Sequence, residues 1–287
     1  MQDHTVNLNG VDLHYRTIGD GPALFLVTPG WGIATGYLQR AFSSLAKHCR
    51  LVFIDTRGSG LSSRPANPTH MGSVDMANDL EALRVHLDLS DIGILGHSNS
   101  GAIALAYAAG YPDRVTKLVL IDSQVLGLSA AADTQRILQN RSTDPRFEEA
   151  ARVVSTFFTG QINPAASDDG LKAFIAQVLP LYLHRPEKSL SLAQEQLSGP
   201  ISSYAFASQF AADAAFPIDQ TKSLSAIRAK VLIMVGRHDY ICPVALSERL
   251  YENIPESQLV IFEESGHLPW LEEPNAFFAE LERFLIS

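Results

Sequence analysis

The chain has 287 residues, 46% of them hydrophobic and 18% charged, so it can bury a core in one or two domains without disulfides or a metal. A net charge of −9 and the lack of a Lys/Arg cluster argue against a nucleic-acid partner, because phosphate binding needs a basic face. The sequence contains no run of 18 apolar residues, so we expect no membrane span. With two cysteines and no signal-peptide pattern at the N-terminus, we expect a reduced, cytoplasmic protein.

The first part of the chain alternates between short apolar runs and helical patterns. Two alternating runs, 5–8 and 11–17, flank Asn9-Gly10, a dipeptide typical of tight turns, and predict a hairpin. The later runs are continuous and apolar, as is typical of strands buried on both faces of a parallel sheet. We predict strands at 23–27, 51–54, 92–95 and 118–121 and helices at 37–48, 75–87 and 102–109.

This rhythm stops near residue 129 and returns near residue 223. The segment between them predicts helices and no clear strand. Beyond it we predict strands at 231–235 and 258–262 and helices at 243–251 and 274–285. Strands alternating with helices indicate an α/β fold with a mostly parallel sheet. We therefore expect a sheet domain, 1–128 and 223–287, interrupted by a helical insertion, 129–222.

A candidate nucleophile lies where the strand at 92–95 meets the next helix. The connection is GHSNSG at 96–101. So tight a reversal needs small residues two positions either side of its apex, and Gly96 and Ser100 meet that need around Ser98. A serine at the apex points its hydroxyl away from the sheet, above a helix N-terminus that favours negative charge. We predict Ser98 as the nucleophile; Ser100 is the alternative in a second register, although the strand ends too early for it.

A base and an acid for this serine follow two later strands. His267 comes after the strand at 258–262, and Asp239 comes after the strand at 231–235. Parallel strands present their C-terminal ends at one sheet edge, so the loops that follow them meet there. We expect His267 to take the serine proton and Asp239 to fix the imidazole tautomer and stabilise its charged form. Asp122, directly after an earlier strand, is the competing acid.

Two backbone amides are candidates for an oxyanion hole. The Asn99 amide follows the nucleophile, and a loop near the start of the chain supplies the second, which we assign to Trp31. Gly30 and Gly32 let that backbone approach a substrate. The sequence contains neither an H-E-x-x-H motif nor a Cys/His cluster, and the glycine spacing at 30–36 does not match a dinucleotide fingerprint. We therefore expect no metal and no cofactor.

With these residues in place, the chain resembles the serine hydrolases of the α/β-hydrolase fold over nearly its whole length. The resemblance rests on PGWG (29–32), DTRGSGLS (55–62), GHSNSG (96–101), GRHDYICP (236–243) and SGHLPWLEEP (265–274). It implies a Ser98–Asp239–His267 triad and an insertion that forms a cap over the site.

Within that family, the RGSGLSSRP motif at 57–65 and the long insertion are similar to proline-iminopeptidase-like members. The chain departs from them twice. It carries TPGWG where they carry HGGPG, and GHSNSG where they carry GGSWG. Those peptidases hold the amino group of the substrate with cap carboxylates, for which Glu187 and Glu195 are the candidates here.

The cap is expected to place an apolar ceiling over a small-molecule substrate. Its candidate residues are Phe157, Phe158, Tyr182, Tyr204, Phe206 and Phe210. At each single position, packing inside the cap is the more frequent fate of such a side chain.

We expect the protein to hydrolyse an ester or lactone of a small organic substrate through an acyl-enzyme. Two alternatives stay open: a proline-iminopeptidase-like aminopeptidase, and a non-catalytic small-molecule receptor on the same fold. No nucleic acid and no membrane is expected as a partner, and a homodimer is compatible with the sequence.

Overall fold

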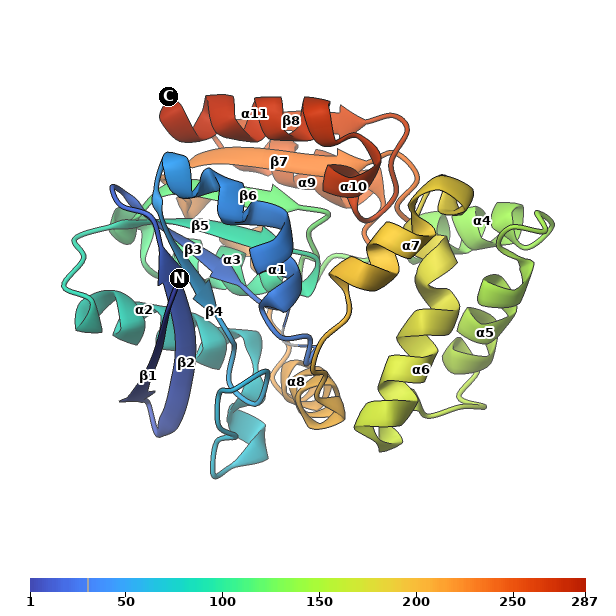
Figure 1. Cartoon of the computed structure of the whole chain (residues 1–287), viewed down its shortest axis with the longest axis horizontal. Coiled ribbons are helices and arrows are strands. Elements are labelled where there is room, and N and C mark those ends of the chain that lie inside the picture. Colours follow the sequence, from blue (N-terminus) through green and yellow to red (C-terminus); the bar gives the residue numbers. More distant parts are fainter. Residues whose placement is uncertain (30) are drawn as a thin grey trace.

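An eight-stranded sheet forms the centre of the computed structural model, which describes residues 1–29 and 31–287 (Figure 1). The strand order is β1-β2-β4-β3-β5-β6-β7-β8. The strands are β1 (Gln2–Leu8), β2 (Val11–Ile18), β3 (Ala23–Val27), β4 (Arg50–Ile54), β5 (Ile92–His97), β6 (Val115–Ile121), β7 (Lys230–Gly236) and β8 (Ser257–Phe262).

The predicted hairpin forms one edge of this sheet. Asn9 and Gly10 have φ values of 50° and 77°, which is the left-handed pair that a two-residue turn needs to match the twist of its strands. β1 and β2 pair antiparallel, and β2 also runs antiparallel to β4. The strands from β4 to β8 run parallel to one another. The sheet is therefore mostly parallel, as the apolar runs predicted.

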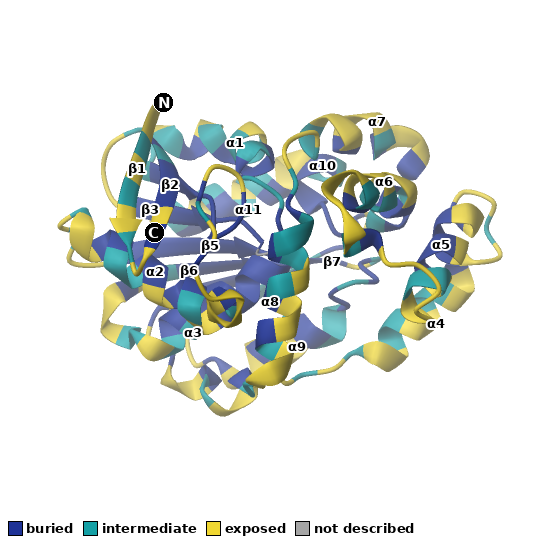
Figure 2. Ribbon diagram, turned by 90° about the horizontal axis from the view of Figure 1, so that it is seen from below, coloured by how far each residue is buried: buried dark blue, intermediate teal, exposed yellow. Residues whose placement is uncertain are grey.

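Helices cover both faces of the parallel part of the sheet, which is why its central strands are continuously apolar, whereas β1 and β2 at the edge alternate. In β3, Phe25 and Val27 pack into a cluster with α2, α3 and α9, whereas Leu24 and Leu26 pack into a second cluster with α1 and α11. Figure 2 shows the central strands as buried, and it shows β1 at the sheet edge and the outward helix faces as largely exposed. The covering helices are α1 (Gly36–Phe42), α2 (Ser73–His86), α3 (Asn99–Gly110), α9 (Val244–Asn253), α10 (Pro269–Glu272) and α11 (Pro274–Ile286).

The predicted helix at 37–48 is two pieces in the structure. α1 ends at Phe42, and a 3₁₀ helix, η1 (Ser43–Lys47), continues the chain. The Ser43 hydroxyl donates to the Gln39 carbonyl oxygen at 2.6 Å, and such a side-chain bond competes with the backbone ladder. The other short 3₁₀ helices are η2 (Pro68–Met71), η3 (Pro112–Arg114), η4 (Pro164–Ala166), η5 (Leu179–Tyr182), η6 (Gln220–Lys222) and η7 (Leu224–Ala226).

Five α-helices lie between β6 and β7, and we call them the inserted helices. Four of them, α4 to α7, stand beyond the end of the sheet toward which β5 and β7 run, and α8 packs against η2 (Figure 1). Part of them packs around a small core that includes Val153, Val154 and Leu181, and Tyr240 from the loop after β7 joins that core. The inserted helices are α4 (Ala131–Arg141), α5 (Glu148–Phe158), α6 (Asp168–Val178), α7 (Pro186–Gln196) and α8 (Ser203–Ala215).

Among the described residues, no helix is both long enough and apolar enough to cross a membrane. The division of the chain into two domains at 128 and 223 stays a prediction.

Candidate active site

The reversal between β5 and α3 holds Ser98 in a strained backbone conformation. Its φ of 58° and ψ of −126° lie where residues other than glycine are rare. Three backbone hydrogen bonds fix this conformation. The Ser98 amide donates to the Ile121 carbonyl oxygen at 2.9 Å, and the Ser98 carbonyl oxygen accepts from the amides of Gly101 and Gln124 at 3.0 Å. The strain is thus imposed by the neighbouring strand and helix, as expected of a serine held for reaction.

The small residues around this turn are required by close packing. A Cβ at Gly96 would lie 2.6 Å from the Ser100 carbonyl oxygen, and one at Gly101 would lie 1.9 Å from Ser123 Oγ. Ser100 is buried inside α3, where its hydroxyl accepts from the His97 amide and donates to the His97 oxygen, both at 2.8 Å. The hydroxyl of Ser100 is therefore engaged by backbone, which favours Ser98 as the candidate nucleophile.

His267 and Asp239 form a buried pair. His267 Nδ1 lies 2.7 Å from Asp239 Oδ2, and the two side chains are 2% and 0% exposed. A carboxylate only accepts, so Nδ1 carries the proton and Nε2 is the basic nitrogen of the neutral ring. Ser98 and His267 line one pocket, although the hydrogen bonds of the described residues do not include one between them. Such contacts commonly tighten only when substrate binds.

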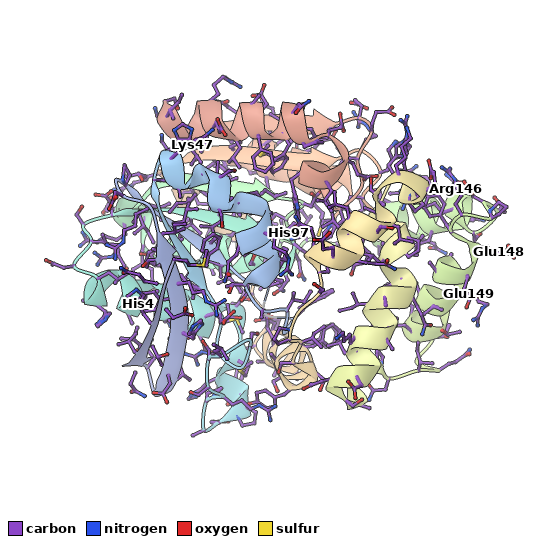
Figure 3. All side chains as sticks on the ribbon, in the orientation of Figure 1. His4, Lys47, His97, Arg146, Glu148 and Glu149 are labelled. Atoms are coloured by element: carbon purple, nitrogen blue, oxygen red, sulfur yellow. The ribbon has the colours of Figure 1, made fainter. Side chains whose placement is uncertain are left out.

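His97 packs against the ring of His267. His97 Nε2 donates to the His267 carbonyl oxygen at 3.0 Å, which leaves Nδ1 to accept from the Tyr37 hydroxyl at 3.2 Å. Burial lowers the pKa of His97 well below its usual range, so the ring stays neutral beside the candidate base. Figure 3 places His97 in the interior beside α1, far from the outward Glu148 and Glu149.

The loop that carries His267 is tied to the segment between α6 and α7. The Glu272 carboxylate accepts from the amides of Gly266 at 2.7 Å, His184 at 3.0 Å and Arg185 at 2.9 Å. The His267 amide also donates to the Tyr182 oxygen at 2.6 Å. One acidic side chain thus joins the base loop to the segment before α7, a role that sequence reasoning did not assign to Glu272.

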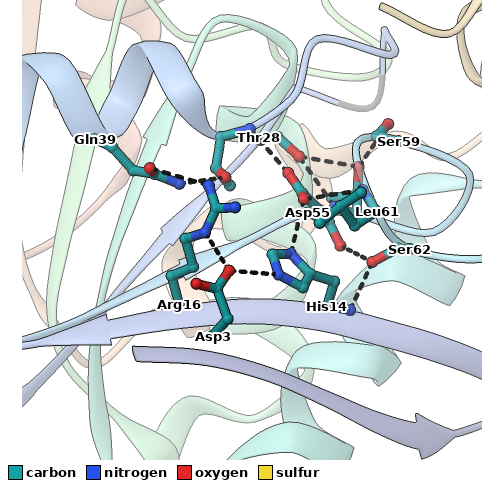
Figure 4. A network of polar contacts seen from close by, with 11 residues as sticks. Asp3, His14, Arg16, Thr28, Gln39, Asp55, Ser59, Leu61 and Ser62 are labelled. Carbon is teal, nitrogen blue, oxygen red and sulfur yellow. Dashed lines mark hydrogen bonds and ion pairs between the residues drawn. The ribbon is translucent and has the colours of Figure 1, made fainter. Parts of the chain in front are cut away.

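A polar network holds the loop that carries Trp31 (Figure 4). The Thr35 amide, which follows this loop, donates to the Asp55 carboxylate at 2.8 Å, and His14 Nδ1 donates to the same carboxylate at 3.0 Å. The Thr28 hydroxyl, which precedes the loop, accepts from the Thr56 amide at 3.0 Å. The hydrogen bond to Asp55 raises the pKa of His14. Both ends of the candidate oxyanion loop are therefore anchored to the end of β4.

The inserted helices also contact this loop. A Cβ at Gly32, whose φ is 83°, would lie 2.1 Å from the Ser202 oxygen, and the Ser202 amide donates to the Gly32 oxygen at 2.9 Å. The Trp31 ring meets the edge of Phe206 with centroids 5.2 Å apart. Asn99 is the first residue of α3, where amides point toward the helix start. The donor roles of Trp31 and Asn99 stay predictions, and Gly30 lies outside the described residues.

A narrow pocket of about 30 Å³ contains Ser98 and His267. This volume is far below the several hundred Å³ of a drug-sized site. Ile175, Tyr182 and Leu197 reach it from the insertion. Besides Ser98, His267 and His97, the residues that line the pocket are apolar or aromatic: Pro29, Trp31, Ile33, Tyr37, Ile175, Tyr182, Leu197 and Leu268.

Of the six predicted ceiling residues, the lining of this pocket includes Tyr182. Phe206 lies behind Trp31, and the Tyr204 ring packs under the Arg64 guanidinium at 4.3 Å. Phe157, Phe158 and Phe210 are not brought to the pocket. The ring of Phe157 packs on Phe158 and Phe174, and Phe158 and Phe210 are 65% and 70% exposed.

The two cap carboxylates proposed for an amino group lie away from Ser98. Glu187 is exposed and pairs with Arg146 at 3.5 Å, and Glu195 is exposed as well. Among the described residues, the pocket lining contains no carboxylate.

In the part of the chain that the structure describes, two overlapping groups of side chains have the spacing of metal ligands. They are His97, Asp122 and His267, and Asp239, Cys242 and His267, and the ligand atoms in each group lie within 4.8 Å of one another. Both include His267, whose Nδ1 already bonds to Asp239, and both ring nitrogens of His97 are engaged. A cation there would have to break these bonds.

Comparison with known proteins agrees with the geometry. A family described as alpha/beta hydrolase fold matches residues 23–274. The AB hydrolase superfamily protein YclE of Bacillus subtilis is 30% identical over 286 residues, covering 96% of each chain. A pimeloyl-[acyl-carrier protein] methyl ester esterase of Aliivibrio salmonicida is 28% identical, covering 95% of each chain. A proline iminopeptidase of Levilactobacillus brevis is 25% identical, covering 100% of this chain and 97% of its own.

Among solved structures, an alpha/beta fold family hydrolase from Bacillus anthracis superposes with a TM-score of 0.79. It covers 99% of both chains at 21% sequence identity, and it therefore shows the shared fold alone.

Proposed function

Because the chain belongs to the α/β-hydrolase family, we propose that it is a serine hydrolase that cleaves an ester or lactone of a small, uncharged substrate. The observation that carries the proposal is the buried Asp239–His267 pair in the same narrow pocket as the strained Ser98. The similarity of the chain to a pimeloyl-[acyl-carrier protein] methyl ester esterase supports an ester as the bond that is cleaved.

The reaction follows from these positions. His267 Nε2 takes the Ser98 proton as Ser98 Oγ attacks the carbonyl carbon, and Asp239 stabilises the imidazolium that forms. The amides of Trp31 and Asn99 hold the oxyanion. The imidazolium then protonates the leaving alcohol, and a water activated by His267 hydrolyses the acyl-enzyme.

Pocket size and polarity set the expected substrate. A cavity of about 30 Å³ with apolar walls accommodates a short acyl group, and a longer one requires side chains to move. The segment 129–222 acts as a cap, because three of its residues line this cavity. A cationic amino group would enter without a carboxylate partner, at a cost of several kcal/mol. We therefore place aminopeptidase activity second, although a proline iminopeptidase is among the relatives.

The test compares initial rates on p-nitrophenyl acetate, butyrate and octanoate with those on proline p-nitroanilide, using the wild type and Ser98→Ala. We expect kcat/KM to fall as the acyl chain lengthens, no measurable anilide cleavage, and loss of both burst and turnover in Ser98→Ala. Faster cleavage of the anilide would favour the aminopeptidase. Saturable ester binding without a burst or turnover would favour a non-catalytic receptor.

A further inference from the structure

A second buried carboxyl lies beside the candidate acid. Asp122 follows β6 with a φ of 46°, and its side chain is fully buried. Its amide donates to the Met234 oxygen at 2.8 Å, and its Oδ1 accepts from the Gly236 amide at 2.9 Å. Asp122 is thus fixed to the end of β7, directly before the loop that carries Asp239.

The other oxygen of this carboxyl has no hydrogen-bond donor. Asp122 Oδ2 is the single buried carboxyl oxygen of the described residues that is left without one. An ionised carboxylate in that position would carry an unsatisfied, buried negative charge, which costs several kcal/mol. A protonated carboxyl removes the charge and turns the same atom into a donor.

The Asp239 carboxylate can accept a hydrogen bond from such a proton. Asp239 Oδ2 accepts from His267, and Asp239 Oδ1 accepts from the Ile241 amide at 2.8 Å, so each oxygen retains a second lone-pair site. A ring nitrogen of His267 lies within 4.8 Å of an Asp122 oxygen, and the side chains of Asp122 and Asp239 lie within hydrogen-bonding reach of each other. Two acids this close share one proton rather than ionise together.

A buried cation lies close to the pair. Arg141 reaches in from α4, where its guanidinium donates to the carbonyl oxygens of Leu181 and His238, and its charge interacts with those of Asp239 and Glu272. The other titratable groups near Asp122 are Asp239, Glu272, the Cys242 thiol, His267 and the neutral His97. Burial, with the Asp239 charge adding to it, raises the pKa of Asp122 well above its usual range.

We infer that Asp122 is a protonated positioning residue that donates a hydrogen bond from Oδ2 to the Asp239 carboxylate and so holds the acid against His267. The inference rests on the proposed function, since it assigns Asp239 to the triad. Asp122 touches neither substrate nor reacting atoms, and it acts through Asp239.

The same amide substitution should therefore be tolerated at Asp122 and costly at Asp239. Asp122→Asn keeps an acceptor for the Gly236 amide and replaces the O–H donor by an N–H donor. Asp239→Asn presents a donor to His267 and misorients the ring, at a cost of about 10⁴-fold in kcat. Asp122→Leu, similar in volume, loses the donor, and kcat falls by about 10- to 100-fold, the factor for one hydrogen bond to a charged group.

The experiment measures kcat, KM and the pH profile of p-nitrophenyl acetate hydrolysis for these three variants. We expect Asp122→Asn to restore most of the kcat that Asp122→Leu loses, with KM unchanged. The acid limb of kcat/KM should move to higher pH in Asp122→Leu, because an Asp239 carboxylate without its donor stabilises the imidazolium more. A loss in Asp122→Asn as large as in Asp239→Asn would overturn the inference, since Asp122 would then act as a carboxylate.

A second readout does not depend on activity. Folding of the wild type takes up the Asp122 proton at neutral pH, so its folding equilibrium constant should fall about tenfold per pH unit relative to Asp122→Asn between pH 5 and 7. Asp20→Asn, an exposed matched control, should run parallel to the wild type. Parallel curves for the wild type and Asp122→Asn would overturn the inference. If the wild type hydrolysed no ester but the tenfold slope remained, the proposed function alone would fail.

Discussion

Replacing Gly236 with alanine should displace the candidate base without touching it. A Cβ on Gly236, the last residue of β7, would lie 1.9 Å from the Gly266 oxygen and 2.6 Å from the Ser265 oxygen. Both atoms belong to backbone, so no side chain can swing away. The loop must retreat by about 1.5 Å to reach ordinary contact. It has little room to do so, because the Cβ position of Gly266 is already 2.3 Å from the Tyr182 oxygen.

The expected cost has two parts. Overpacking of this kind destabilises a protein by about 1–3 kcal/mol. His267 follows Gly266, so the imidazole moves with the loop, and a misplacement of about 1 Å costs about 10²-fold in rate. We therefore expect Gly236→Ala to remain folded and to lose about 10²-fold in kcat.

The assay combines urea unfolding with the kinetics of p-nitrophenyl acetate hydrolysis. Gly110→Ala is the matched control, since nothing lies within 4 Å of its Cβ position at the end of α3. Alanine there should leave kcat unchanged and add at most about 1 kcal/mol of stability. A Gly236→Ala variant with the wild-type kcat would refute the reasoning that packing between β7 and the His267 loop positions the base.

Three further substitutions test other parts of the site. Ser100→Ala should cost about 1–3 kcal/mol, because the buried His97 amide loses its acceptor, while kcat stays near that of the wild type; loss of turnover comparable to that of Ser98→Ala would move the nucleophile to Ser100. The raised pKa of His14 means that its charge stabilises the fold fully below about pH 6.5 and that this stability is lost as the pH rises through the raised value. Urea unfolding between pH 6 and 9 should therefore show a smaller decline for His14→Gln than for the wild type, and equal declines would count against the pairing. Ile175→Ala should raise the butyrate-to-acetate ratio of kcat/KM by about tenfold or more, and an unchanged ratio would mean that α6 does not limit the acyl chain.

The sheet could be predicted because its physical signal is local. A strand buried on both faces must be apolar at every position, and this is what the runs in β3, β5 and β7 show. The meeting of Asp239 and His267 could be predicted as well, since the C-terminal ends of parallel strands share one edge. The tight turn at Ser98 could be predicted from the small residue Gly96 two positions before it, because such a reversal leaves room for few side chains.

The pocket lining could not be derived in the same way. Ile175 and Leu197 face the cavity, but an apolar helical residue has the same spacing whether it faces a cavity or a neighbouring helix. Large aromatic residues were therefore predicted in its place, and Phe158 and Phe210 among them face solvent. The predicted helix at 37–48 changes to a 3₁₀ helix at Ser43, whose hydroxyl also donates to the Gln39 carbonyl oxygen.

The hydrogen bonds that hold the loops of the site could not be predicted from the sequence either. Asp55 joins Thr35 and His14, which lie 20 and 41 residues away along the chain. Glu272 joins the His267 loop to the segment before α7 across 88 residues. Nothing in the spacing of these residues shows which amide or ring each carboxylate will meet, because the pairs form only when the fold brings them together.

The most direct test of the account is the site of the acyl group in a trapped acyl-enzyme. The protein is mixed with p-nitrophenyl acetate, quenched in acid during the burst and digested with trypsin, which releases Ser98 and Ser100 together in the peptide 85–114. Fragmentation by mass spectrometry should place one acetyl group on Ser98, with none in the Ser98→Ala protein. Acetylation of Ser100, or ester turnover with this peptide unmodified, would contradict the central claim.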